Sequence, residues 1–117
     1  MAEPMADACF FCRIASGEIP VTLIAQNAHA VAFRDIHPQA PVHVLVIPRR
    51  HIASLAQAMD AEEVGAVSLL AAEVARSEGI SDGGYRTVMN TGRDGGQTVF
   101  HLHLHLLGGR TMTWPPG

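Results

Sequence analysis

The segment from His101 to Leu107 (HLHLHLL) constrains the fold more than any other part of the chain. Histidine alternates with leucine, and successive side chains of a strand point to opposite faces of its sheet. The alternation predicts a strand over 99–107 that turns its leucines into the core and places His101, His103 and His105 together on the other face. Three adjacent imidazoles add little to stability, because they repel one another when charged and are hard to satisfy when buried.

Three interpretations of this segment are open on the residues alone. It could be a half-exposed strand that happens to be rich in histidine. It could hold a metal ion, although a catalytic metal site needs a third ligand and an open position, and no acidic residue stands nearby. The third interpretation is nucleophilic catalysis by one imidazole, with its neighbours as acid, base and orienting groups.

A glycine-rich segment from Asn90 to Thr98 (NTGRDGGQT) directly precedes the histidines. Its glycines let backbone N–H groups approach an anion closely, and Thr98 adds a hydroxyl donor. An ordinary surface turn would explain the glycines but not their position beside three imidazoles. The two segments together predict a cradle for a phosphate-sized anion.

Length and composition narrow the class of protein. A chain of 117 residues predicts one domain over 1–117, with 1–7 as a flexible terminus. The net charge of −3 gives no basic face for nucleic acid. All eight cationic side chains are arginine, and without a lysine neither Schiff-base chemistry nor a P-loop is possible. We see no signal peptide and no membrane-spanning run, and expect a cytoplasmic protein.

The periodicity predicts an α+β fold, an antiparallel five-stranded sheet with one long and one short helix. Asp60 is placed to cap the long helix, and Gly79 to end it near Glu78. The short helix should end at Gly17. The other expected elements are listed by range: a short helix at 8–16, strands at 21–26, 29–34, 43–47, 85–90 and 99–107, and a loop at 35–41.

Cys9 and Cys12 (CFFC) are too few for a disulfide scaffold. They could form a redox pair, half of a zinc site, or two small buried residues in a helix. A thioredoxin-like pair would follow a strand, and none is visible before it. A closed zinc site needs four ligands, so two would have to come from elsewhere in the chain.

At this point the sequence resembles a known family, the histidine triad (HIT) superfamily of nucleotide hydrolases and transferases. The segment from His101 to Leu107, called the triad segment below, has the histidine pattern of this superfamily, and the resemblance runs from about Phe10 onward. The HINT branch, the nucleoside phosphoramidases, is the most similar. Sister branches fit less well: galactose-1-phosphate uridylyltransferases usually have glutamine where this chain has His105. The matching segments are DIHPQAP from Asp35, HVLVIP from His43, Arg50-His51-Ile52, GYR from Gly84, GGQT from Gly95, and GGRTMTWPPG from Gly108.

The resemblance implies a HIT-like fold whose sheet continues across a homodimer. The tail at 109–117 would lie near the partner's active site, where Trp114 would shape the leaving-group side. The implied substrate is a purine nucleoside 5′-phosphoramidate, and the implied bound partner is this compound or the corresponding monophosphate. Neither nucleic acid nor a membrane is implied as a partner.

The resemblance also implies residue roles. His103 would attack the α-phosphorus and form a covalent nucleotidyl-histidine, with a backbone carbonyl holding its Nδ1–H. His105 would donate to a phosphoryl oxygen, supported by His43. Thr98 and backbone N–H groups around Gly96 would stabilise the developing charge, and no cofactor would be needed for catalysis.

Nucleotide binding would involve a larger set of side chains. Asp35 would accept hydrogen bonds from the ribose hydroxyls, which are both donors. Asn90 would line the phosphate site. Four apolar residues would clamp the base, or belong to the ordinary core: Phe11, Ile14, Phe33 and Ile36.

The resemblance to some microbial HIT proteins with this CxxC also implies a structural Cys₂His₂ zinc site. Here it would consist of Cys9, Cys12, His51 and His101. Such a zinc would be structural, and His101 would then hold the triad segment in place. Three other functions remain as alternatives. They are a nucleotide- or partner-binding module with vestigial hydrolysis, a dinucleoside polyphosphate hydrolase, and a zinc-dependent hydrolase.

Overall fold

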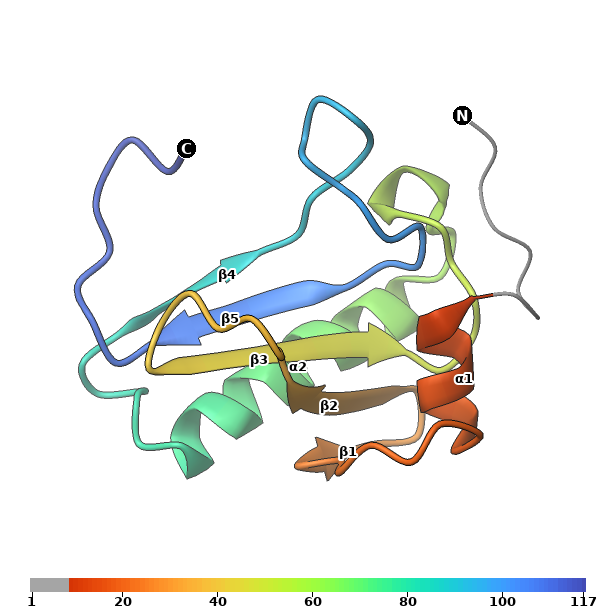
Figure 1. The fold of residues 1–117 in the computed structure, drawn as a ribbon, viewed down its shortest axis with the longest axis horizontal. Helices are drawn as coiled ribbons and strands as arrows, with labels where there is room; N and C mark the ends of the chain where they lie inside the picture. The colour runs from red at the N-terminus through yellow and green to blue at the C-terminus, as the bar shows by residue number, and fades with distance from the viewer. Residues whose placement is uncertain (1–8) are drawn as a thin grey trace.

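The computed structural model describes residues 9–117, so the terminus expected at 1–7 lies outside it. Strands in the order β1-β2-β3-β5-β4 form one antiparallel sheet (Figure 1). This confirms the α+β class, with five strands and two α-helices over these residues. The elements are α1 (Phe10–Ser16), β1 (Ala25–Gln26), β2 (Ala30–Arg34), β3 (Val42–Pro48), a 3₁₀ helix η2 (Leu55–Gln57), α2 (Ala61–Ser77), β4 (Tyr85–Val88) and β5 (Leu104–Gly108).

Both helices end as their sequences predict. The Asp60 carboxylate accepts a hydrogen bond from the backbone N–H of Glu62, at the start of α2. Gly17 follows α1 in the left-handed conformation at φ 83°, which glycine adopts without a Cβ penalty. Glu63 stands three residues after Asp60, where a glutamate often completes a capping box by accepting from the N-cap N–H. Here its carboxylate pairs with Arg50 instead. None of the helices described over 9–117 is long and apolar enough to cross a membrane.

The two faces of the sheet have different roles. α2 covers one face, where a large apolar cluster includes Val44 and Val46 of β3 and Leu102, Leu104 and Leu106. This confirms that the leucines of the triad segment enter the core. On the opposite face, α1 covers only one end of the sheet (Figure 1), with Phe11 and Ile14 packed against β2 and β3. His43 and His105 lie on this second face, which leaves room for a site beside α1.

Three expected strands were too long, and the one expected at 85–90 ends at Val88. The strand expected at 21–26 is reduced to Ala25–Gln26, because Val21 and Leu23 pack against the core instead of pairing along β2. The strand expected at 99–107 begins only at Leu104. His101 and His103 therefore lie in irregular backbone before β5, where the Leu102 N–H bonds the carbonyl of Ile52 at 2.6 Å.

Candidate active site

His103 is oriented by the backbone of its own segment. Its Nδ1 lies 2.8 Å from the carbonyl oxygen of His101, as expected for a ring held by a carbonyl. Because a carbonyl oxygen only accepts, Nδ1 must carry the hydrogen, and in the neutral ring Nε2 keeps its lone pair. The residue is 7% exposed, and the Phe11 and His103 rings pack edge to face at a centroid distance of 5.3 Å. The geometry therefore leaves a lone pair on Nε2, as a nucleophile requires.

His43 and His105 form a directed chain of hydrogen bonds. The backbone N–H of Gln39 donates to Nδ1 of His43 at 2.9 Å, so the hydrogen of the neutral His43 ring is on Nε2. That nitrogen lies 2.9 Å from Nδ1 of His105 and donates to it. The hydrogen of His105 is then on its Nε2, the nitrogen left for a substrate. The chain makes His105 a donor beside the His103 ring, whose centroid is 5.0 Å away.

Burial keeps this chain of imidazoles neutral. Burial, with smaller contributions from His103 and His43, lowers the pKa of His105 to about 4. The pKa of His43 is also lowered by burial, against the opposing effect of the Asp35 carboxylate. Near neutral pH both rings are therefore uncharged, as the hydrogen-bond directions require.

Asp35 lies next to this chain at the end of β2. One carboxylate oxygen accepts from the His37 N–H at 2.7 Å, and the other is 3.4 Å from Nε2 of His43. Asp35, His43 and His105 also have the composition of a metal site. Nε2 of His43 carries a hydrogen in the neutral tautomer, however, and cannot ligate a metal. We therefore interpret the cluster as a hydrogen-bonded one.

The glycine-rich loop is organised by Gln97, which the sequence analysis did not single out. This side chain is 5% exposed, accepts from the Gly92 N–H and donates to the carbonyls of Ala53 and Val99. The Gly96 N–H itself is used within the turn, where it donates to the Arg93 carbonyl at 3.0 Å. Thr98 is exposed, and among residues 9–117 neither its hydroxyl nor its N–H has a hydrogen-bond partner. Both donors of Thr98 are therefore available for an anion.

A second cluster lies beneath the triad segment. Nδ1 of His101 is 3.3 Å from each of the two cysteine sulfurs, and the His51 Nδ1 is 3.3 Å from Sγ of Cys12. The four ligand atoms of Cys9, Cys12, His51 and His101 all lie within 4.8 Å of one another. His101 is fully buried and its Nε2 donates to the Pro48 carbonyl at 2.9 Å, which turns the lone pair of Nδ1 toward the sulfurs.

This donor set fits a zinc ion. Tetrahedral zinc takes two thiolates and two imidazole nitrogens, and a carbonyl on the far nitrogen of a histidine ligand fixes its tautomer. Burial, followed by the hydrogen bond and charge of Cys9, raises the pKa of the Cys12 thiol to about 12. A bound cation would reverse that effect and favour the thiolate.

Most of the chain is similar to proteins of one known family. A family model described as the HIT domain matches residues 16–112. The chain belongs to the HIT domain family. An uncharacterized HIT-like protein of Synechococcus elongatus is 48% identical over 115 residues, which are 97% of this chain and 100% of that protein. A HIT family hydrolase from Legionella pneumophila, known by crystal structure, is 51% identical, with a TM-score of 0.89 over 93% of this chain and 99% of that one.

Two more distant solved structures have informative names. A histidine triad nucleotide-binding protein from Candida albicans is 31% identical, with a TM-score of 0.78 over 92% of this chain and 82% of that one. A zinc-bound histidine triad family protein from Mycobacterium smegmatis is also 31% identical, with a TM-score of 0.79 over 91% and 78% of the two chains. The chain therefore has the fold of HIT family hydrolases, and its Cys/His cluster is compatible with structural zinc.

The base-binding residues expected in this HIT domain differ in exposure. Phe11, Ile14 and Phe33 are buried in the core cluster beneath α1, as the core interpretation of these side chains requires. Ile36 is 86% exposed in the loop beside Asp35. Asn90 is half-buried where β4 leads into the glycine-rich loop.

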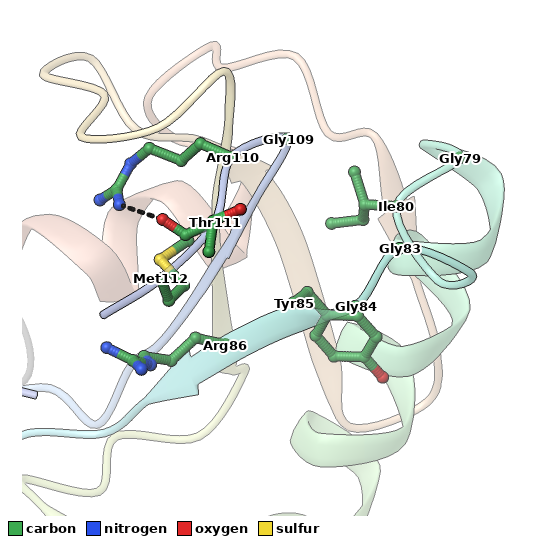
Figure 2. Close-up of a pocket in the computed structure, with 10 residues that line it drawn as sticks. All are labelled: Gly79, Ile80, Gly83, Gly84, Tyr85, Arg86, Gly109, Arg110, Thr111 and Met112. Carbon is green, nitrogen blue, oxygen red and sulfur yellow. Dashed lines mark hydrogen bonds between the residues drawn. The ribbon is translucent and has the colours of Figure 1, made fainter. Parts of the chain in front are cut away.

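Trp114 lies in the tail of the HIT domain and is 81% exposed. The guanidinium of Arg86 is 6.0 Å from the centre of its ring, within the range of a cation–π contact, and also donates to the Thr113 carbonyl. Arg86 and the tail line a hollow of about 490 Å³ (Figure 2). None of the expected site residues lines this hollow. The hollow therefore lies at the outer edge of the sheet, apart from the triad.

Proposed function

We propose that this HIT domain is a nucleoside phosphoramidase of the HINT branch. The observation that supports it most is the pairing of a free Nε2 on His103 with a donor Nε2–H on the neighbouring His105. A nucleophile and an oxyanion donor on adjacent rings suit displacement at phosphorus, where negative charge builds up on the non-bridging oxygens.

The proposed reaction has two steps. Nε2 of His103 forms a bond to the α-phosphorus of a purine nucleoside 5′-phosphoramidate while the P–N bond breaks, and the departing amine takes a proton from solvent. Water then attacks the same phosphorus, the bond from phosphorus to the imidazole breaks, and the protons of this water pass to solvent as the nucleoside monophosphate forms. His105 and Thr98 stabilise the charge in both steps, and Asp35 holds the ribose hydroxyls.

A structural zinc belongs to this proposal. The Cys/His cluster would hold the zinc ion, and the ion would link α1 to the segment before β5 through His101. His101 uses Nδ1 toward the cluster and Nε2 toward Pro48, so neither nitrogen is left for acid–base work. The catalytic chemistry would depend on the imidazoles and not on the metal.

A homodimer with a continuous sheet completes the proposal. β4 is the last strand of the sheet, so one side of its backbone is unpaired within the described chain. Pairing of two such edges would protect them and bury the exposed Tyr85. The tail with Trp114 would then lie close to the partner's site.

The test is a single-turnover experiment with adenosine 5′-phosphoramidate, quenched early and analysed by intact mass. An adduct of the mass of AMP is expected on the wild type and on His29→Ala, whose histidine is outside the site, but not on His103→Ala. Absence of both adduct and AMP release would overturn the proposal. Binding of AMP without turnover would instead favour the binding module, and cleavage of diadenosine polyphosphate alone would favour the dinucleoside polyphosphate hydrolase.

A further inference from the structure

The C-terminal tail contacts the loop that carries Asp35. The guanidinium of Arg110 donates from Nε and Nη2 to the carbonyl oxygen of Gln39, at 3.2 and 3.1 Å. Gly109, next to Arg110 in Figure 2, lies so close to Pro41 that a Cβ on it would be 2.9 Å from the proline Cβ. Two adjacent tail residues thus lie against the loop at 35–41, far from them in sequence.

Gln39 connects this contact to the imidazoles. Its backbone N–H is the donor to Nδ1 of His43, and its carbonyl is the acceptor for Arg110. These two groups belong to the peptide units on either side of the Gln39 Cα, so together the bonds fix the backbone angles of this residue. Within the described chain, Arg110 is the one hydrogen-bond donor to that carbonyl.

We infer that Arg110 is a positioning residue for the proposed reaction, acting through Gln39 and His43 on the hydrogen-bond direction of His105. The expected effect on kcat rests on the proposed function, whereas the expected effect on the hydrogen positions of His43 and His105 rests on the hydrogen-bond chain. If the Gln39 N–H leaves His43, Nδ1 of that ring can take the hydrogen. Nε2 of His43 then becomes an acceptor, and His105 loses the arrangement that puts its own hydrogen on Nε2.

The kinetic effect should fall mainly on kcat. Arg110 does not touch the proposed ribose site, and two bonds that do not involve Arg110 hold Asp35: its N–H donates to the His43 carbonyl, and one carboxylate oxygen accepts from the His37 N–H. Loss of one hydrogen bond of about 0.5–1.5 kcal/mol corresponds to a factor of roughly 2–12. We therefore expect Arg110→Ala to lower kcat about 3- to 10-fold, with less than a twofold change in KM.

The experiment compares three variants with the wild type. Arg110→Lys keeps a donor near the carbonyl and should retain kcat within about twofold. Arg49→Ala is the matched control, because the Arg49 guanidinium also donates from Nε and Nη2 to one exposed backbone carbonyl, that of Asn27, at 3.2 and 3.0 Å. Kinetics with adenosine 5′-phosphoramidate are measured together with ¹⁵N NMR of the histidine rings.

The spectra separate this inference from the proposed function. In the wild type, His43 and His105 should each show a protonated Nε2 and an unprotonated Nδ1, and Arg110→Ala should shift these signals while Arg49→Ala leaves them. That result supports the positioning role even if the wild type has no phosphoramidase activity. Wild-type ring signals in Arg110→Ala, or equal losses of kcat in Arg110→Ala and Arg49→Ala, would overturn it.

Discussion

Gln97 connects three backbone groups through one buried amide, so substituting it tests how much these bonds stabilise the glycine-rich loop. Alanine at this position leaves three backbone groups without the partner they have now. Because an unsatisfied buried group costs about 1–3 kcal/mol, we expect Gln97→Ala to lower the free energy of unfolding by about 2–4 kcal/mol. Urea denaturation measures this, with exposed Gln26→Ala expected within about 0.5 kcal/mol of the wild type. A similar loss in both variants would contradict the role of Gln97.

The buried imidazole of His43 and the half-buried imidazole of His105 should make stability depend on pH. The folded-state pKa of both is lowered, that of His105 to about 4 from an ordinary value of 6.5. Between these pH values the unfolded chain binds protons that the folded chain does not, so the free energy of unfolding falls as the pH drops from 6.5 toward 4. Urea midpoints at pH 7.5 and 5 should therefore differ more in the wild type than in His105→Gln. Equal differences would show that the ring is not held neutral.

The residues alone offered Cys9 and Cys12 as half of a zinc site, because both side chains have a chemical reason to be present. The carbonyl on the His103 ring was expected from the family resemblance, and the structure has it. Sequence reasoning missed Gln97 and the Gln39 N–H. A backbone donor has no side chain to identify it, and a glutamine between glycines and threonine is typical of any loop.

At the scale of elements, β5 shows how a correct pattern can give a wrong boundary. The alternation of histidine and leucine holds from 101 onward, and the leucines do enter the core. The first part of the segment nevertheless does not continue the β3–β5 ladder, because the Leu102 N–H donates to the carbonyl of Ile52 and the His101 side chain donates to that of Pro48. Alternation reports which face a side chain takes, whereas a strand also needs a neighbour, and neighbours distant in sequence are not visible in a local pattern.

If the Cys/His cluster holds zinc, as we propose, α1 and the segment before β5 depend on one ion. We expect about one zinc per chain by elemental analysis, and less in Cys12→Ser. Ligand binding stabilises a fold by about 2.7 kcal/mol at 100 times the dissociation constant, so chelation should lower the melting temperature. Ser16→Ala, with an exposed hydroxyl at the end of α1, is the control and should keep both the zinc and the melting temperature. Unchanged melting of a zinc-free wild type would rule out a structural metal.

At the scale of the whole molecule, the sequence predicted an antiparallel sheet but not the strand order. Pairing of β3 with β5, which brings His43 to His105, joins residues that are far apart in the chain. Their hydrophobic patterns would have allowed other neighbours. The family resemblance was what placed these two histidines in one site, and the fold agrees with it.

The edge strand β4 gives a prediction for assembly. If two sheets join there, the protein should sediment with twice the mass of one chain, and Tyr85→Asp should shift it toward the monomer by placing a charge at the seam. Met59→Asp is the control, because Met59 is 95% exposed in the connection that leads into α2. A wild-type monomer at micromolar concentration would contradict the continuous sheet.

The division of the sheet into two faces has a consequence for how this protein tolerates change. Along β3, Val44 and Val46 face α2, whereas His43 faces the site. In a mutational scan that scores abundance and turnover separately, substitutions at the two valines should lower both scores. Substitutions at His43 should lower turnover and spare abundance, so the two scores should diverge at His43 and fall together at the two valines. Selection could therefore retune the chemistry of this strand while leaving its contribution to folding almost untouched.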